Sequence, residues 1–195
     1  MSITIKDGRT ANTMRVREDG RATTHAVIQA EAKAQSVAGD SFSINTKLVS
    51  ITGDTALLYI KNNDAKDLHV DFAIMFIGAN GTHTGETALE CTRNPTGGTL
   101  ISGGTAAAIK ANQNFGHSQT FSTIDALTGA DLATVTGGED ISFVGASAGL
   151  NRTPVGTSWV LPTGSSAAFK ILPNLTSGAV NAYVAVVGYL EEAAE

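Results

Sequence analysis

From Ser41 onward the sequence is a succession of short apolar and threonine-rich runs, and glycine, proline or asparagine stops each of them. Runs of about four to nine residues have the length of β-strands. They follow one another too closely to leave room for the crossover helices of an α/β fold. The chain of 195 residues has 21 glycines and only 16% charged residues, which argues against a coiled coil. The pattern predicts an all-β fold, an antiparallel β-sandwich.

The longest alternating run, 69–77, shows how these strands are expected to pack. Its large apolar side chains are expected to share the buried face: Val70, Phe72, Ile74 and Phe76. His69, Asp71 and Ala73 are expected on the opposite face. The last run, 182–190, is apolar on both faces, which is typical of a central strand. The other predicted strands are 42–45, 47–52, 56–61, 88–92, 99–102, 106–110, 119–124, 131–136, 141–144, 157–161 and 167–172.

Residues 1–40 differ from the body, because they contain no aromatic residue and show little strand pattern. We predict an N-terminal arm over 1–40, extended or partly helical over 24–38, ahead of a β-sandwich body over 41–195. Residues 1–21 hold five basic residues against three acidic ones, while the whole chain has a net charge of −5. The basic residues are candidate contacts with an acidic neighbour, a second copy of the chain included: Lys6, Arg9, Arg15, Arg17 and Arg21.

The overall charge and the cysteine content exclude several classes of protein. An acidic chain without a basic face is not expected to bind nucleic acid. A single cysteine, Cys91, allows no intrachain disulfide. The first residues lack the apolar segment of a secretory signal, and no apolar run is long enough to span a membrane. We therefore expect no membrane partner.

Catalytic and metal-binding patterns are weak in this chain. Residues 145–149 read Gly-Ala-Ser-Ala-Gly, which matches a nucleophile elbow, but Pro154 prevents the helix that must follow Ser147. Cys91 lies in an apolar run and is interpreted as a buried cysteine rather than a nucleophile. His83 with Glu86 and Glu90 could hold a metal, but such ligands commonly occur by chance in a glycine- and threonine-rich loop, so no metal site is predicted. The sequence predicts no catalytic residue, no metal and no cofactor.

The chain has few aromatic residues, and most of them lie in predicted strands. Four could stack on sugar rings if they were exposed: Trp159, Tyr59, Tyr183 and Tyr189. Burial in the core or in a subunit interface is the favoured interpretation for them.

Four segments of the sequence resemble a family of structural proteins. They are DGRTANTMRVREDGRATTH (7–25), SINT…LVSITGDTALLYIKNNDAKDLHVDFAIMFIG (43–78), GGTAAAIKANQNFGHSQT (103–120) and WVLPTGSSAAFKILPN…NAYVAVVGYLEE (159–192). Together they are similar to head decoration (cement) proteins of tailed bacteriophages, which have a jelly-roll body. The resemblance implies no catalytic residues. It implies binding to the major capsid protein and to two further copies of the chain.

These observations lead to three hypotheses about function. The first is a homotrimeric virion protein on the capsid surface, assembled in the host cytoplasm, that stabilises the capsid lattice. The alternative is a phage tail or fibre module that binds a carbohydrate receptor through its loops, such as 79–87 and 145–156. The third hypothesis, an enzyme that uses Ser147 or Cys91, is the least favoured.

Overall fold

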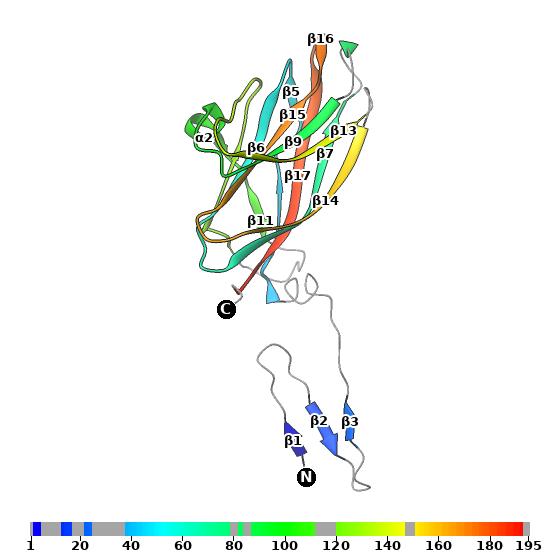
Figure 1. The fold of residues 1–195 in the computed structure, drawn as a ribbon, viewed down its shortest axis with the longest axis vertical. Coiled ribbons are helices and arrows are strands. Elements are labelled where there is room, and N and C mark those ends of the chain that lie inside the picture. Colours follow the sequence, from blue (N-terminus) through cyan, green and yellow to red (C-terminus); the bar gives the residue numbers. More distant parts are fainter. Residues whose placement is uncertain are drawn as a thin grey trace. The chain divides into compact units, whose positions relative to one another are not determined.

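The computed structural model describes residues 2–4, 13–16, 22–24, 38–78, 82–83, 87–111, 120–146 and 151–192. The chain divides into two compact units, Met1–Ala34 and Gln35–Glu195 (Figure 1). Among the described residues, no helix is long and apolar enough to cross a membrane.

The described part of the N-terminal unit is a small antiparallel sheet. Its strands are β1 (Ser2–Thr4), β2 (Thr13–Val16) and β3 (Ala22–Thr24), in that order. The helix predicted over 24–38 lies outside the described residues, apart from its ends.

The second unit is a β-sandwich of two six-stranded sheets, in which every strand pair is antiparallel. The prediction of an all-β sandwich is confirmed at this level. The β6 sheet has the order β10 (Thr105–Ala106), β12 (Ile124–Thr128), β6 (Thr55–Asn62), β15 (Ser166–Leu172), β9 (Thr87–Arg93) and β13 (Glu139–Ala146). The β17 sheet has the order β11 (Ile109–Ala111), β4 (Ser41–Asn45), β17 (Val180–Glu191), β7 (Asp67–Ile77) and β14 (Asn151–Leu161), and β5 (Val49–Ile51) also pairs with β17. A ribbon of β8 (Thr82–His83) and β16 (Leu175–Ser177) completes the unit.

The core lies between the two sheets. Phe42 and Ile44 from β4 meet Leu58, Ile60 and Phe169 from the β6 sheet in one cluster of buried side chains. Fully burying a side chain of this size contributes about 1.5–3 kcal/mol. The inner faces of the long strands therefore supply the main stabilisation of the body.

A second, smaller cluster covers part of the outer face of the β6 sheet. The short helix α2 (Thr99–Gly103) places Leu100 over Tyr59 and Ala168. Figure 1 shows α2 beside β6. The prediction of a strand over 99–102 is wrong. Gly98 has a φ of 109°, and a Cβ there would lie 2.3 Å from the carbonyl oxygen of Thr134, so the chain turns at this glycine and begins a helix.

Three other predicted strands are wrong in place or extent. Residues 120–123 precede β12 instead of forming a strand, and 131–135 form a turn and a loop. The loop replaces strand pairing with tertiary hydrogen bonds, because Thr52 N donates to Asp131 Oδ1 at 2.7 Å and Ala56 N donates to the carbonyl of Ala133 at 2.7 Å. The predicted strand 106–110 is split between β10 and β11, which belong to opposite sheets.

Strand β14 begins earlier than predicted and includes Pro154. Proline lacks the N–H group that a central strand must donate to a neighbour. Because β14 is the edge of the β17 sheet, only one side of it is paired, and proline is tolerated there.

Candidate interaction surface

A β-bulge in β7 determines which side chains of the β17 sheet point away from the core. Val187 of β17 pairs with Phe72, but the next residue, Gly188, pairs with Val70, so Asp71 is an extra residue in β7. Because side chains alternate along a strand, one inserted residue moves all later side chains to the other face. Before the bulge Val70 is buried, and after it the buried positions are Ala73, Met75 and Ile77.

The prediction that Phe72, Ile74 and Phe76 share the buried face with Val70 is therefore wrong. These three side chains lie on the opposite side from the core and are only half-buried. A signal for this was present in the sequence, because Ala73, Met75 and Ile77 are also apolar. After Asp71 the strand is apolar on both faces, so the polarity of its side chains could not identify the buried face.

Strand β17 continues this apolar surface. Tyr183, Ala185 and Val187 are half-buried and stand opposite Phe76, Ile74 and Phe72 in the strand register. The rings of Phe76 and Tyr183 stack, with centroids 5.1 Å apart and planes 14° from parallel. We call these six residues the apolar stripe: Phe72, Ile74, Phe76, Tyr183, Ala185 and Val187.

On the other side of the bulge, toward the start of β7, the same face carries a second aromatic pair. His69 and Tyr189 stack with centroids 4.8 Å apart, and His69 Nε2 lies 3.5 Å from Glu191 Oε2. Val160 of β14 pairs with His69 in the register and is 47% exposed. Aromatic and apolar groups therefore follow almost the whole length of β7 and β17.

The size of this face is suited to a protein contact. Strand β7 has 11 residues, which corresponds to about 35 Å at about 3.3 Å per residue. The four neighbouring strands β4, β17, β7 and β14 span about 19 Å at about 4.8 Å per strand. These lengths bound the area at about 670 Å², at the lower end of the roughly 600–1,000 Å² that each partner buries in a standard interface. On β4 the stripe is flanked by Ser43 and Asn45, which are uncharged.

Of the five predicted basic contact residues, the described part of the chain includes the backbone of one. Lys6, Arg9, Arg17 and Arg21 lie outside the described residues. The backbone of Arg15 lies in β2, where it pairs with Ser2 and Thr23. Their contacts remain predictions.

The two candidate nucleophiles differ in what the structure shows of them. Cys91 lies on the inner face of β9, is 1% exposed and belongs to the main core cluster. Burial, with a smaller contribution from the charge of Asp140, raises the pKa of the Cys91 thiol to about 12. The thiol is therefore protonated at neutral pH and is not a nucleophile in this state. Ser147 lies outside the described residues.

The residues weighed as metal ligands do not form a cluster in the described part of the chain. His83 lies in β8, and Glu86 lies outside the described residues. Glu90 forms an ion pair with Lys170 of the neighbouring strand β15. Among the described residues, no group of three or more histidine, cysteine, aspartate or glutamate side chains comes together.

The four aromatic candidates for sugar stacking have different surroundings. Tyr59 is buried beneath α2, Tyr183 is part of the apolar stripe, and Tyr189 is buried against His69. Trp159 is half-buried and lines a cavity of about 510 Å³ at one end of β14.

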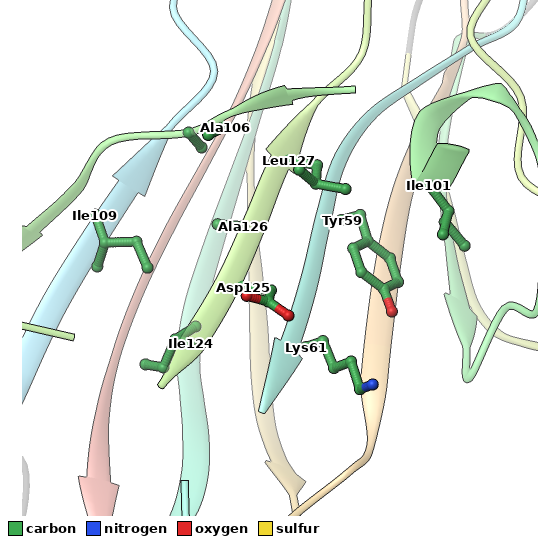
Figure 2. Close-up of a pocket in the computed structure, with 10 residues that line it drawn as sticks. Tyr59, Lys61, Ile101, Ala106, Ile109, Ile124, Asp125, Ala126 and Leu127 are labelled. Atoms are coloured by element: carbon green, nitrogen blue, oxygen red, sulfur yellow. The ribbon is translucent and has the colours of Figure 1, made fainter. Parts of the chain in front are cut away.

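Another cavity, of about 430 Å³, lies beside β10 and β12 at one end of the β6 sheet. Figure 2 shows Tyr59 and Lys61 of β6 next to Asp125 and Leu127 of β12, with Ile101 of α2 on one side. The Asp125 carboxylate accepts a hydrogen bond of 2.7 Å from Asn63 Nδ2. A neighbouring side chain of the protein therefore already binds this carboxylate.

A scan against the models of known protein families matches none of them, and a search of curated proteins finds no match.

Proposed function

We propose that this protein is a virion structural protein of a tailed bacteriophage, a homotrimeric decoration (cement) protein that binds the major capsid protein and stabilises the capsid lattice. In this proposal the sandwich is a jelly-roll body on the capsid surface, and residues 1–40 are an arm that attaches it. The protein has no catalytic role and no cofactor. The apolar stripe is the observation that supports the proposal most directly.

A long apolar stripe parallel to the strands suits a threefold axis. In a closed trimer each copy presents the same surface to the axis and contacts both neighbours. Three stripes that meet along the axis remove Phe72, Phe76 and Tyr183 from water together. Aromatic side chains at the centre of an interface contribute most of its binding free energy.

The charge distribution supports a separate role for the arm. The first 21 residues of the arm contain five basic and three acidic residues, whereas the remainder of the chain has a net charge of −7. Opposite charges increase the rate at which an arm meets an acidic neighbour and help to set its register. Lys6, Arg9, Arg15, Arg17 and Arg21 are the residues that we assign to contacts with capsid protein or neighbouring copies.

The mass of the protein in solution tests the self-association surface. We expect light scattering after size exclusion to give three times the chain mass for the wild type. Ile74→Lys places a charge in the centre of the stripe and is expected to give a monomer, because a buried, unpaired charge opposes association. Thr105→Lys, at an exposed position of β10 in the other sheet, is the matched control and should remain trimeric. A monomeric wild type would contradict the homotrimer.

The copy number in purified virions tests the location on the particle. A ratio to the major capsid protein of one, or a simple fraction of one, is expected for a lattice-binding protein. A handful of copies per particle would instead favour the tail or fibre receptor-binding alternative. Absence from the virion would contradict both.

A further inference from the structure

The cavity beside Trp159 is independent of the apolar stripe. Its walls come from the end of β14, the turn after it, the start of β15, the end of β9 and the start of β13. At about 510 Å³ it falls within the roughly 300–1,000 Å³ of small-molecule sites. The residues used below are Arg93, Asn94, Ile141, Trp159 and Ser165.

Trp159 is accessible because the sandwich is open at this place. The residue pairs with Val70, a core residue, and its ring packs on Phe169 with centroids 6.0 Å apart. An inward side chain of this kind is normally buried. However, β14 and β13 are the edge strands of their sheets, so Trp159 stays half-buried. Ile141, the extra residue at the bulge in β13, is 40% exposed on the opposite wall.

Backbone hydrogen bonds hold the polar wall of the cavity in place. Asn62 N donates to the carbonyl of Ser165 at 3.0 Å, and Asn94 N donates to the carbonyl of Ser166 at 2.8 Å. The Asn94 side chain is oriented as well, because its Oδ1 accepts a hydrogen bond of 2.8 Å from Ser166 N. The cavity is thus formed before any ligand arrives, which lowers the entropic cost of binding.

The charges at the rim favour a neutral ligand. Arg93 forms an ion pair with Glu139, so the guanidinium charge is compensated at the cavity. A phosphate or a carboxylate would have to compete with Glu139 for Arg93. The guanidinium, amide and hydroxyl groups nevertheless offer hydrogen bonds to a ligand rich in hydroxyls.

We propose that this cavity is a carbohydrate-binding site that accepts a neutral pyranose ring. The C–H face of the sugar packs on the indole of Trp159, whose negative face attracts the partly positive hydrogens. The hydroxyl groups on the ring edge bond to Asn94, Arg93 and Ser165. A wholly apolar ligand would leave this polar wall unpaired, which costs binding free energy.

Trp159 is the only tryptophan in the chain, so fluorescence reports directly on the cavity. We would titrate the full chain with glucose, galactose, N-acetylglucosamine and rhamnose, and with glycerol as a polyol that lacks a ring. The expected result is a saturable change in emission with at least one sugar, at a dissociation constant of about 1 mM, and none with glycerol. Isothermal titration calorimetry provides a second measurement of the same binding.

A matched pair of variants tests whether the response comes from the cavity. Asn94 and Asn174 both have a φ of 48°, and Asn174 does not line the cavity. Asn94→Gly keeps the positive φ without strain, but it removes both the amide assigned to the sugar and the acceptor of the Ser166 N hydrogen bond, and it should weaken sugar binding at least tenfold. Asn174→Gly makes the same replacement elsewhere and should bind as the wild type does.

Two results would overturn the assignment. One is the absence of saturable binding to every sugar by both methods. The other is an equal response in Asn94→Gly and the wild type. Neither result bears on the trimer, which is tested by mass, so the site and the proposed function fail separately.

Discussion

At the residue scale, the outward turn of the apolar stripe depends on Gly188. A Cβ at this position would lie 2.1 Å from the carbonyl oxygen of His69 and 2.8 Å from the Phe42 ring. Both neighbours belong to closely packed strands, so neither has room to move. Glycine is therefore required where β17 crosses the bulge in β7.

We predict that Gly188→Ala lowers the free energy of unfolding by about 1–3 kcal/mol, the usual cost of overpacking a core. The measurement is urea denaturation followed by circular dichroism. Gly103→Ala is the control, because a Cβ at Gly103 meets nothing within 4 Å. The control should unfold at the urea concentration of the wild type or slightly above it. Equal stability of the two variants would show that the bulge can relax.

At the element scale, α2 has five residues, which is too few for a helix to be stable on its own. Its stability comes from Leu100, which is fully buried on Tyr59 and Ala168. Hydrogen bonds from Leu100 N to the carbonyl of Thr134 and from Thr134 N to Thr99 Oγ1 join the helix to the loop beside it. The helix and the loop therefore cover the β6 sheet together.

We predict that Leu100→Ala costs about 2–5 kcal/mol of stability, as expected for a leucine deleted from a packed core. Ile101→Ala should cost clearly less, because Ile101 is only half-buried. Thermal unfolding of both variants measures the difference. Equal losses would contradict the view that α2 is held by one side chain.

At the scale of the whole molecule, the chain divides into Met1–Ala34 and Gln35–Glu195, and we expect the second unit to fold without the first. Among the described residues, the main core cluster is formed within 42–190. We predict that a chain of residues 35–195 unfolds cooperatively, with a midpoint within a few degrees of the full chain. Calorimetry of the two chains checks this. A body that is unfolded without residues 1–34 would contradict it.

The same truncated chain tests attachment, which rests on the proposed function. It should no longer bind capsid shells that lack the protein, whereas the full chain should bind them. Replacing Lys6, Arg9, Arg15, Arg17 and Arg21 with glutamine separates the effect of charge from that of the arm as a whole. Undiminished binding by residues 35–195 would remove the role assigned to the arm.

The sequence by itself determined the fold class and most of the strands. Runs of threonine, valine and isoleucine between turn residues are a local signal. They can be recognised without knowing which strands pair with one another. Segments such as 56–61, 88–92 and 167–172 were therefore predicted within one or two residues of β6, β9 and β15. The inward position of Cys91 was also evident, because Ala88, Leu89 and Cys91 form one apolar patch in the predicted strand.

Only the tertiary structure decided which faces are buried and what the surface presents. The bulge at Asp71 arises from pairing with β17, whose residues lie more than 100 positions away. The apolar residues on both faces of β7 after Asp71 left the buried face open, and the pairing with β17 decided it. The helix at 99–103 and the cavity at Trp159 depend equally on distant backbone, on Thr134 for the helix and on the open edge of the sandwich for the cavity. The polarity of a side chain is a property of the residue itself and can be read from the sequence. Burial depends on what packs against it, and that is a property of the assembled sheets.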